Sequence, residues 1–117
     1  MGYMDCTRIL VKWCKHHHIA PGLLSFEGYT NELPEDIGGR CYYFETESRR
    51  TASIQIPEKI RYHCMLCRIA LWHEFCHAEL FIKKGLTGHI LRWYLLVLRK
   101  PHMFIGQLLL ISFWNSL

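Results

Sequence analysis

The sequence predicts one small α+β domain, and three observations support this fold class. Half of the 117 residues are apolar, which is enough for a modest core and argues against a disordered chain. Two segments with strand-like composition, residues 40–46 and 51–57, lie near the middle of the chain. Segments with helical spacing precede and follow them. The order of helix, strands and further helices is that of an α+β fold spanning residues 1–117.

The first half of the chain predicts one helix and a small sheet. Residues 4–16 place apolar side chains at helical spacing, and the segment APG at 20–22 ends this helix. Residues 23–39 predict one strand followed by a loop. Residues 40–46 and 51–57 predict a hairpin, so we expect an antiparallel sheet that packs on the next helix.

The second half predicts helices. Pro57 closes the hairpin, and a long helix is expected over about 58–84, ending at Gly85. A shorter helix follows from about 89 to 99, because Pro101 cannot continue it. These boundaries depend on proline and glycine, the residues that most strongly interrupt a helical pattern.

The apolar C-terminal region requires a test for membrane spans. Residues 90–98 and 103–117 are both strongly apolar, but each is shorter than the roughly 18–20 residues that a span requires. We therefore expect 101–117 to form a last apolar helix that packs on a core at about 38–100. Membrane association of the C-terminal segment is the alternative.

Cysteine content bears on the cellular compartment. Six cysteines would suit a disulfide framework in a secreted protein, but the N-terminus lacks the uninterrupted apolar run of a signal peptide. We therefore expect an intracellular protein, cytoplasmic or nuclear, with reduced thiols. Cys64 and Cys67 could form half of a structural zinc site with Cys14 and one histidine of 16–18, but we favour buried thiols. Residues 16–18 predict a solvated helix end.

Positive charge is concentrated in the second half of the chain. Residues 59–117 carry eight Lys and Arg but two acidic residues, whereas the whole chain has a net charge of +4. Such a half could contact DNA or another acidic surface, or form a solvated rim around the core. Arg49, Arg50, Lys83 and Lys84 are candidates for a phosphate-facing rim. The signal is weak, because no aromatic side chains are interleaved with them.

Residues 71–93, LWHEFCHAELFIKKGLTGHILRW, contain a candidate metal site. His73 and His77 are four residues apart, so on an α-helix they share one face and can reach the same tetrahedral ion. Glu74 lies about 100° around the helix, beside such an ion. There a carboxylate can take a proton from water whose pKa the zinc lowers. This is the logic of the HExxH motif of zinc hydrolases.

A catalytic zinc site normally takes a third protein ligand. No Asp or Glu follows Glu79, and Glu79 itself points away from the line between the two motif histidines. His89 and His102 are the histidines further along the chain. Turns at Gly85 and Gly88 return the chain towards the motif at the start of the next helix, so we favour His89 over His102.

The segment HEFCHAELFIKKGLTGHILRW resembles the signature of the SprT-like zinc metallopeptidases. That signature is HExxHA, an apolar stretch and, after about eleven intervening residues, a Gly-His pair with an aromatic residue four positions on. In this chain the matching residues are His73, Glu74, His77, Ala78, Leu80, Phe81, Gly88, His89 and Trp93.

The resemblance covers roughly residues 38–100 and implies a minimal zincin-like domain. It implies one catalytic Zn²⁺ bound by His73, His77 and His89, with Glu74 as general base. It also implies hydrolysis of peptide bonds in a protein or peptide substrate, and for part of the family these substrates are proteins on DNA.

The sequence therefore predicts a zinc-dependent endopeptidase whose substrate adds to an edge strand, for which residues 51–57 are our candidate. A second hypothesis is a non-proteolytic, zinc-stabilised module that binds nucleic acid or protein. A third is a membrane-apposed peptidase anchored by residues 103–117. Ile90 stands where the family commonly has glycine after the third histidine.

Overall fold

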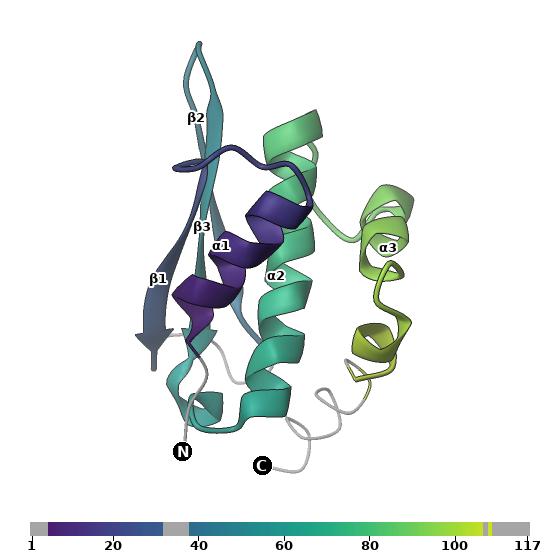
Figure 1. Ribbon diagram of the computed structural model, residues 1–117. Helices are drawn as coiled ribbons and strands as arrows, with labels where there is room; N and C mark the ends of the chain where they lie inside the picture. The colour runs from purple at the N-terminus through teal and green to yellow at the C-terminus, as the bar shows by residue number, and fades with distance from the viewer. Residues whose placement is uncertain (1–4, 32–37, 107, 109–117) are drawn as a thin grey trace.

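Figure 1 shows the computed structural model, which describes residues 5–31, 38–106 and 108. In chain order the elements are α1 (Cys6–His16), β1 (Leu24–Thr30), β2 (Arg40–Glu45), β3 (Arg50–Pro57), the 3₁₀ turn η1 (Glu58–Ile60), α2 (Cys64–Lys84) and α3 (Leu91–Val97). Residues 101–106 are also helical. The α+β class is confirmed. Much of the expected C-terminal helix, 109–117, lies outside the described residues.

The sheet has three strands in the order β1-β3-β2, so β3 is central. β2 and β3 form the predicted antiparallel hairpin, with Cys41 opposite Ile54. β1 runs parallel to β3, so the expectation of an antiparallel sheet is wrong. The edge position predicted for residues 51–57 is also wrong. Both faces of β3 are buried, as the neighbours Ala52 and Ser53 show, and both of its edges are paired.

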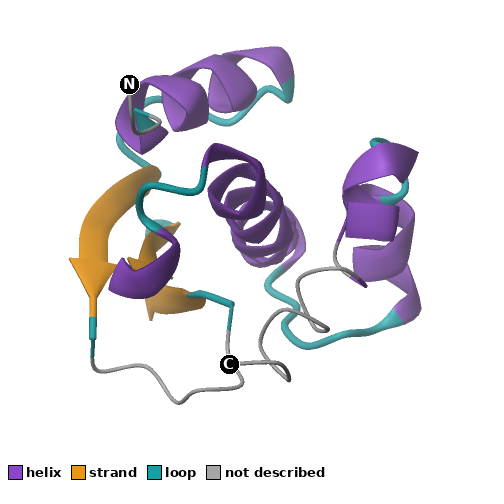
Figure 2. Ribbon diagram, turned by 90° about the horizontal axis from the view of Figure 1, so that it is seen from below, coloured by secondary structure: helices purple, strands orange, loops and turns teal. Residues whose placement is uncertain are grey.

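Helix α2 lies in the middle of the molecule (Figures 1 and 2). The sheet covers one side of α2, α3 lies on the opposite side, and α1 covers a third side. Most of α2 between Leu66 and Phe81 is therefore buried, including Leu71, Trp72 and Phe75. A helix covered on three sides holds its side chains in fixed directions, which matters for the motif that α2 carries.

The ends of α2 have clear physical causes. The helix begins at Cys64 rather than near residue 58, because Glu58–Ile60 form a separate 3₁₀ turn and His63 caps α2. The Nδ1 atom of His63 accepts a hydrogen bond from the backbone N–H of Leu66, at 3.4 Å. At the other end, Gly85 adopts the left-handed conformation, with φ of 68°, as its position predicts.

Helix α1 packs on α2 through its C-terminal end. Trp13 contacts the rings of Trp72 and Phe75, and His17 lies 5.7 and 5.6 Å from the centroids of the same two rings. Burial, followed by the charge of Arg99, lowers the pKa of His17 to about 4. The prediction of a solvated helix end is therefore wrong for His17, which is a packing residue.

All six cysteines are free thiols. Cys67 is buried as expected, but Cys64 is exposed because it begins α2 on the side away from the core. The Sγ atoms of Cys6 and Cys67 lie 3.6 Å apart, so α1 and α2 meet at a pair of thiols. Across the part of the chain that the structure describes, no helix is both long and apolar enough to cross a membrane.

Candidate metal centre

Three histidines from two segments converge on one point between α2 and α3. His73 and His77 are one turn apart on α2, as the sequence predicts. The chain then turns at Gly85 and Gly88, with φ of 68° and 88°, and reaches His89. His89 lies in the loop two residues before α3 rather than on the helix itself, which begins at Leu91. Both turns use backbone conformations that L-residues rarely adopt.

The distances between the three histidines fit a tetrahedral metal ion. The Nε2 atom of His77 lies 3.2 Å from those of His73 and His89, and the third separation is 3.3 Å. Three corners of a tetrahedron with metal–nitrogen bonds of about 2.0–2.1 Å are roughly 3.3–3.4 Å apart. The three imidazoles could therefore hold one metal ion, and they leave a fourth position for another ligand.

Trp93 forms the base of this cluster. Its ring centroid lies 4.7, 4.8 and 4.6 Å from those of His73, His77 and His89, and it stacks on His77 with an interplanar angle of 17°. Its indole N–H donates to the backbone oxygen of His73, at 3.4 Å. In the described residues the Nδ1 atom of His77 has no hydrogen-bond partner, so ring stacking orients this imidazole. The aromatic residue of the predicted signature therefore touches every histidine of the cluster.

The electrostatics of the centre favour a neutral imidazole at His77. Burial, followed by proximity to His73 and His89, lowers the pKa of His77 to about 3. A metal binds the neutral form of histidine, because protonation removes the lone pair that it needs. His77 is therefore ready to act as a ligand at neutral pH.

Glu74 lies beside the cluster and is almost completely buried. Its Oε2 atom is 3.8 Å from the Nε2 atom of His73. Burial raises the pKa of Glu74 to about 8. Gly39, just before β2, makes room for this side chain, since a methyl group at Gly39 would lie 2.9 Å from Glu74 Cγ. Sequence patterns missed Gly39, because it becomes a neighbour of Glu74 only when β2 packs against α2.

Glu79 points away from the metal centre, as predicted, and ties three parts of the chain together. Its carboxylate accepts hydrogen bonds from Lys83, at 2.9 Å, and from the guanidinium of Arg99. Burial alone would raise the pKa of Glu79, but these hydrogen bonds outweigh it and hold the pKa below its ordinary value. Arg99 also contacts His17, and the indole N–H of Trp72 donates to Val97. These contacts fix α3, and with it Trp93, against α2.

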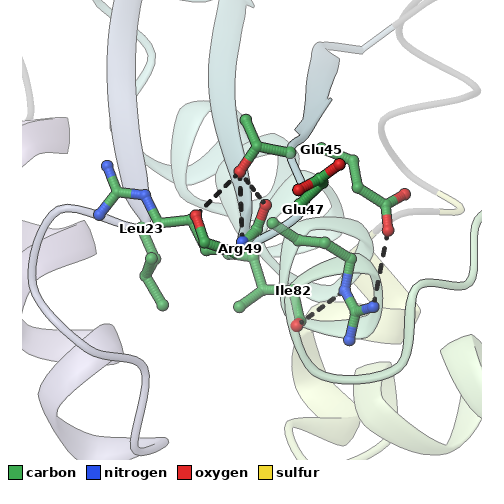
Figure 3. A pocket seen from close by; sticks show the side chains of 8 residues that line it. Leu23, Glu45, Glu47, Arg49 and Ile82 are labelled. Carbon is green, nitrogen blue, oxygen red and sulfur yellow. Dashed lines mark hydrogen bonds and ion pairs between the residues drawn. The ribbon is translucent and has the colours of Figure 1, made fainter.

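The four basic residues predicted to face phosphate are not all available for such a role. Arg50 donates to the backbone oxygen of Ile82 and pairs with Glu45, at 3.9 Å, while Lys83 is held by Glu79. Arg49 and Lys84 are exposed. Both arginines line a surface pocket of about 320 Å³ at the tip of the hairpin (Figure 3), together with Glu45 and Glu47. The pocket carries both positive and negative side chains, which does not favour the binding of nucleic acid. A contact between this protein and nucleic acid stays a prediction.

Other predicted metal sites do not form among the described residues, where His73, His77 and His89 are the one group that could hold an ion. His102 is exposed and lies outside this group, as do Cys14, Cys64 and Cys67. Comparison of the chain with protein-family models, curated proteins and solved structures found no match. Membership of the SprT-like family therefore stays a prediction that rests on the motif.

Proposed function

We propose that this protein is a zinc-dependent endopeptidase with a zincin-like active site. The observation that carries the proposal is the convergence of the three histidine Nε2 atoms to within 3.2–3.3 Å of one another, beside a buried carboxylate. Structural zinc sites usually have four protein ligands, whereas catalytic sites have three and an open position. The described residues supply three.

The donor set is compatible with zinc and argues against magnesium and calcium. Imidazole suits zinc, copper, nickel and iron, whereas magnesium and calcium prefer oxygen ligands. His73, His77 and His89 would hold the ion. When bound, zinc would polarise a substrate carbonyl and lower the pKa of a water molecule.

Glu74 has the position and surroundings of a general base. It precedes one ligand by three residues and follows the other directly, and its Oε2 atom lies 3.8 Å from the Nε2 atom of His73. A cation held by the histidines would lower the pKa of this carboxylate, because an opposite charge nearby favours the ionised form. In the reaction Glu74 would accept a proton from the attacking water and deliver it to the nitrogen of the leaving amine.

Of the two edge strands, β1 and β2, the one that lies closer to Glu74 is β2. Gly39 contacts Glu74 and leads directly into β2, which among the described strands pairs with β3 alone. A peptide in an extended conformation could add to the outer edge of β2 through backbone hydrogen bonds. We therefore transfer the proposed substrate strand from 51–57 to Arg40–Glu45.

The decisive experiment compares Glu74→Gln with wild type. After loading with zinc, both proteins should hold one ion per chain by elemental analysis, and wild type alone should cleave casein, followed by mass spectrometry of the released peptides. Glu27→Gln is the matched control, because Glu27 is exposed on β1. Equal cleavage by Glu74→Gln and wild type would refute the catalytic role.

Two further outcomes separate the alternatives. Zinc binding by wild type without cleavage, in the presence and absence of duplex DNA, would favour a zinc-stabilised binding module. Retention of full zinc affinity by His89→Ala would show that the third ligand is another residue. Mutation of a residue that only supports a zinc ligand typically lowers zinc affinity about 10–100-fold. Removal of the ligand His89 itself should therefore lower the affinity by more than this.

A further inference from the structure

Helix α3 exposes a second apolar face on the side opposite the core. Trp93 and Val97 point inward and are 2% and 0% exposed. Leu91, Leu95 and Leu98 are 73%, 59% and 45% exposed. Their i, i+4, i+7 spacing places these three leucines in one row along the helix. A helix that is apolar all round is normally buried all round. We call this row, with Tyr94, the outer face of α3.

The charge on helix α3 itself is positive. From Leu80 to the last residue the sequence has five Lys and Arg and no Asp or Glu, although Lys83 and Arg99 are paired with the buried Glu79. Arg92 follows Leu91 directly and lies at the border of the outer face, about 60° around the helix from Leu95. Lys84, at the end of α2, is exposed as well. An apolar row with Arg92 at its border and no acidic residue on its own helix complements a surface that is both apolar and anionic.

The combination of exposed leucines with a neighbouring arginine distinguishes between the surfaces that could cover the outer face of α3. Nucleic acid would satisfy Arg92 but would give three exposed leucines no apolar partner. A second copy in a two-fold interface would cover the leucines but would offer Arg92 no acidic partner on the same helix, since α3 contains none. An anionic bilayer offers acyl chains to the leucines and phosphate groups to the arginine.

We propose that the outer face of α3 docks this protein on the surface of an anionic lipid bilayer, with Leu91, Leu95 and Leu98 inserted at the level of the acyl chains. The protein would lie on the bilayer, since no described helix is long and apolar enough to span it. His89 lies two residues before Leu91, so docking would hold the metal centre close to the membrane. The proposal does not depend on the chemistry of that centre.

Vesicle flotation with the full chain tests the proposal. Wild type should float with vesicles containing about 30 mol % phosphatidylserine and should stay at the bottom of the gradient with phosphatidylcholine alone. The double variant Leu91→Ser/Leu95→Ser should lose at least roughly tenfold in partitioning, because two side chains lose their apolar partners. Arg92→Gln should weaken binding and its dependence on salt.

The matched control is Val11→Ser, which removes an apolar side chain that is 65% exposed on α1. It should float like wild type, and circular dichroism should show all variants folded. Failure of wild type to float with anionic vesicles would overturn the proposal, as would flotation of the double variant at the wild-type level. Dimerisation that the double variant abolishes, without flotation, would overturn it in favour of an interface between copies.

Discussion

Gly39 leaves the space that the Glu74 carboxylate occupies, so one added methyl group tests the role assigned to Glu74. In Gly39→Ala the new Cβ would lie 2.9 Å from Glu74 Cγ and 3.2 Å from the backbone oxygen of Gln55. Ordinary carbon–carbon contacts are about 3.5–4.0 Å. The backbone of Gln55 belongs to the central strand and cannot easily yield. The side chain of Glu74 must therefore move by roughly 0.5–1 Å.

The magnitude follows from this displacement. A misplacement of about 1 Å can cost roughly 100-fold in rate, so kcat/KM of Gly39→Ala should fall about 10–100-fold. Overpacking should lower the free energy of unfolding by about 1–3 kcal/mol, and the loss of glycine's freedom in the unfolded chain offsets part of this. Zinc content should not change, because no histidine moves.

The assay combines cleavage of casein, elemental analysis for zinc and urea unfolding. Gly22→Ala is the control, since a Cβ there meets nothing within 4 Å while its φ of 86° makes alanine strained. It should lose about 1–2 kcal/mol of stability and keep full activity. Equal activity in the two variants, or loss of zinc from Gly39→Ala alone, would refute the reasoning.

Three other outcomes can be measured on the same preparations. Zinc at about 100 times its Kd should raise the free energy of unfolding of metal-free protein by about 2.7 kcal/mol, and denaturation scans of His89→Ala should show a much smaller shift. Glu79→Gln should cost about 3 kcal/mol because Arg99 loses its buried partner. Because the pKa of Glu79 is lowered in the folded protein, its contribution to the free energy of unfolding is present above about pH 4.3 and disappears as the pH falls through the folded-state pKa. Glu79→Gln should therefore show a flatter dependence of stability on pH between pH 7 and 3 than wild type. Parallel profiles for the two proteins would contradict the assignment. Diamide should join Cys6 to Cys67, whose Sγ atoms are 3.6 Å apart, and reduce the thiol titre by two; an unchanged titre, or the same loss in Cys67→Ser, would speak against this pairing.

The metal centre was accessible from the sequence because its geometry is local. The spacing of His73 and His77 needs only a helix, and glycine turns then limit where the chain can bring His89. The contact of Trp93 with the centre is also predictable, because this aromatic residue lies four positions, about one helical turn, after His89. By contrast, the contact between Gly39 and Glu74 joins a strand to a helix, and no local pattern reports such packing.

The sheet was less predictable for a related reason. Alternation in residues 51–57 shows that one face is buried, but it does not reveal which strands pair on either side. Ser53 is buried on the second face of β3, and spacing in the sequence does not reveal a parallel partner strand 27 or 28 residues earlier. His17 is a similar case, because Arg99 reaches it from the far end of the chain.

Because His89 lies in a loop rather than on α2, the three ligands of the metal centre are not held equally firmly. Two ligands belong to the most buried helix, whereas the third arrives only when α3 is seated. The apparent affinity for metal therefore scales with the fraction of molecules in which α3 is seated, so a fraction of about one tenth would weaken binding about tenfold. Any contact that seats α3 strengthens metal binding, and bound metal seats α3 by the same factor.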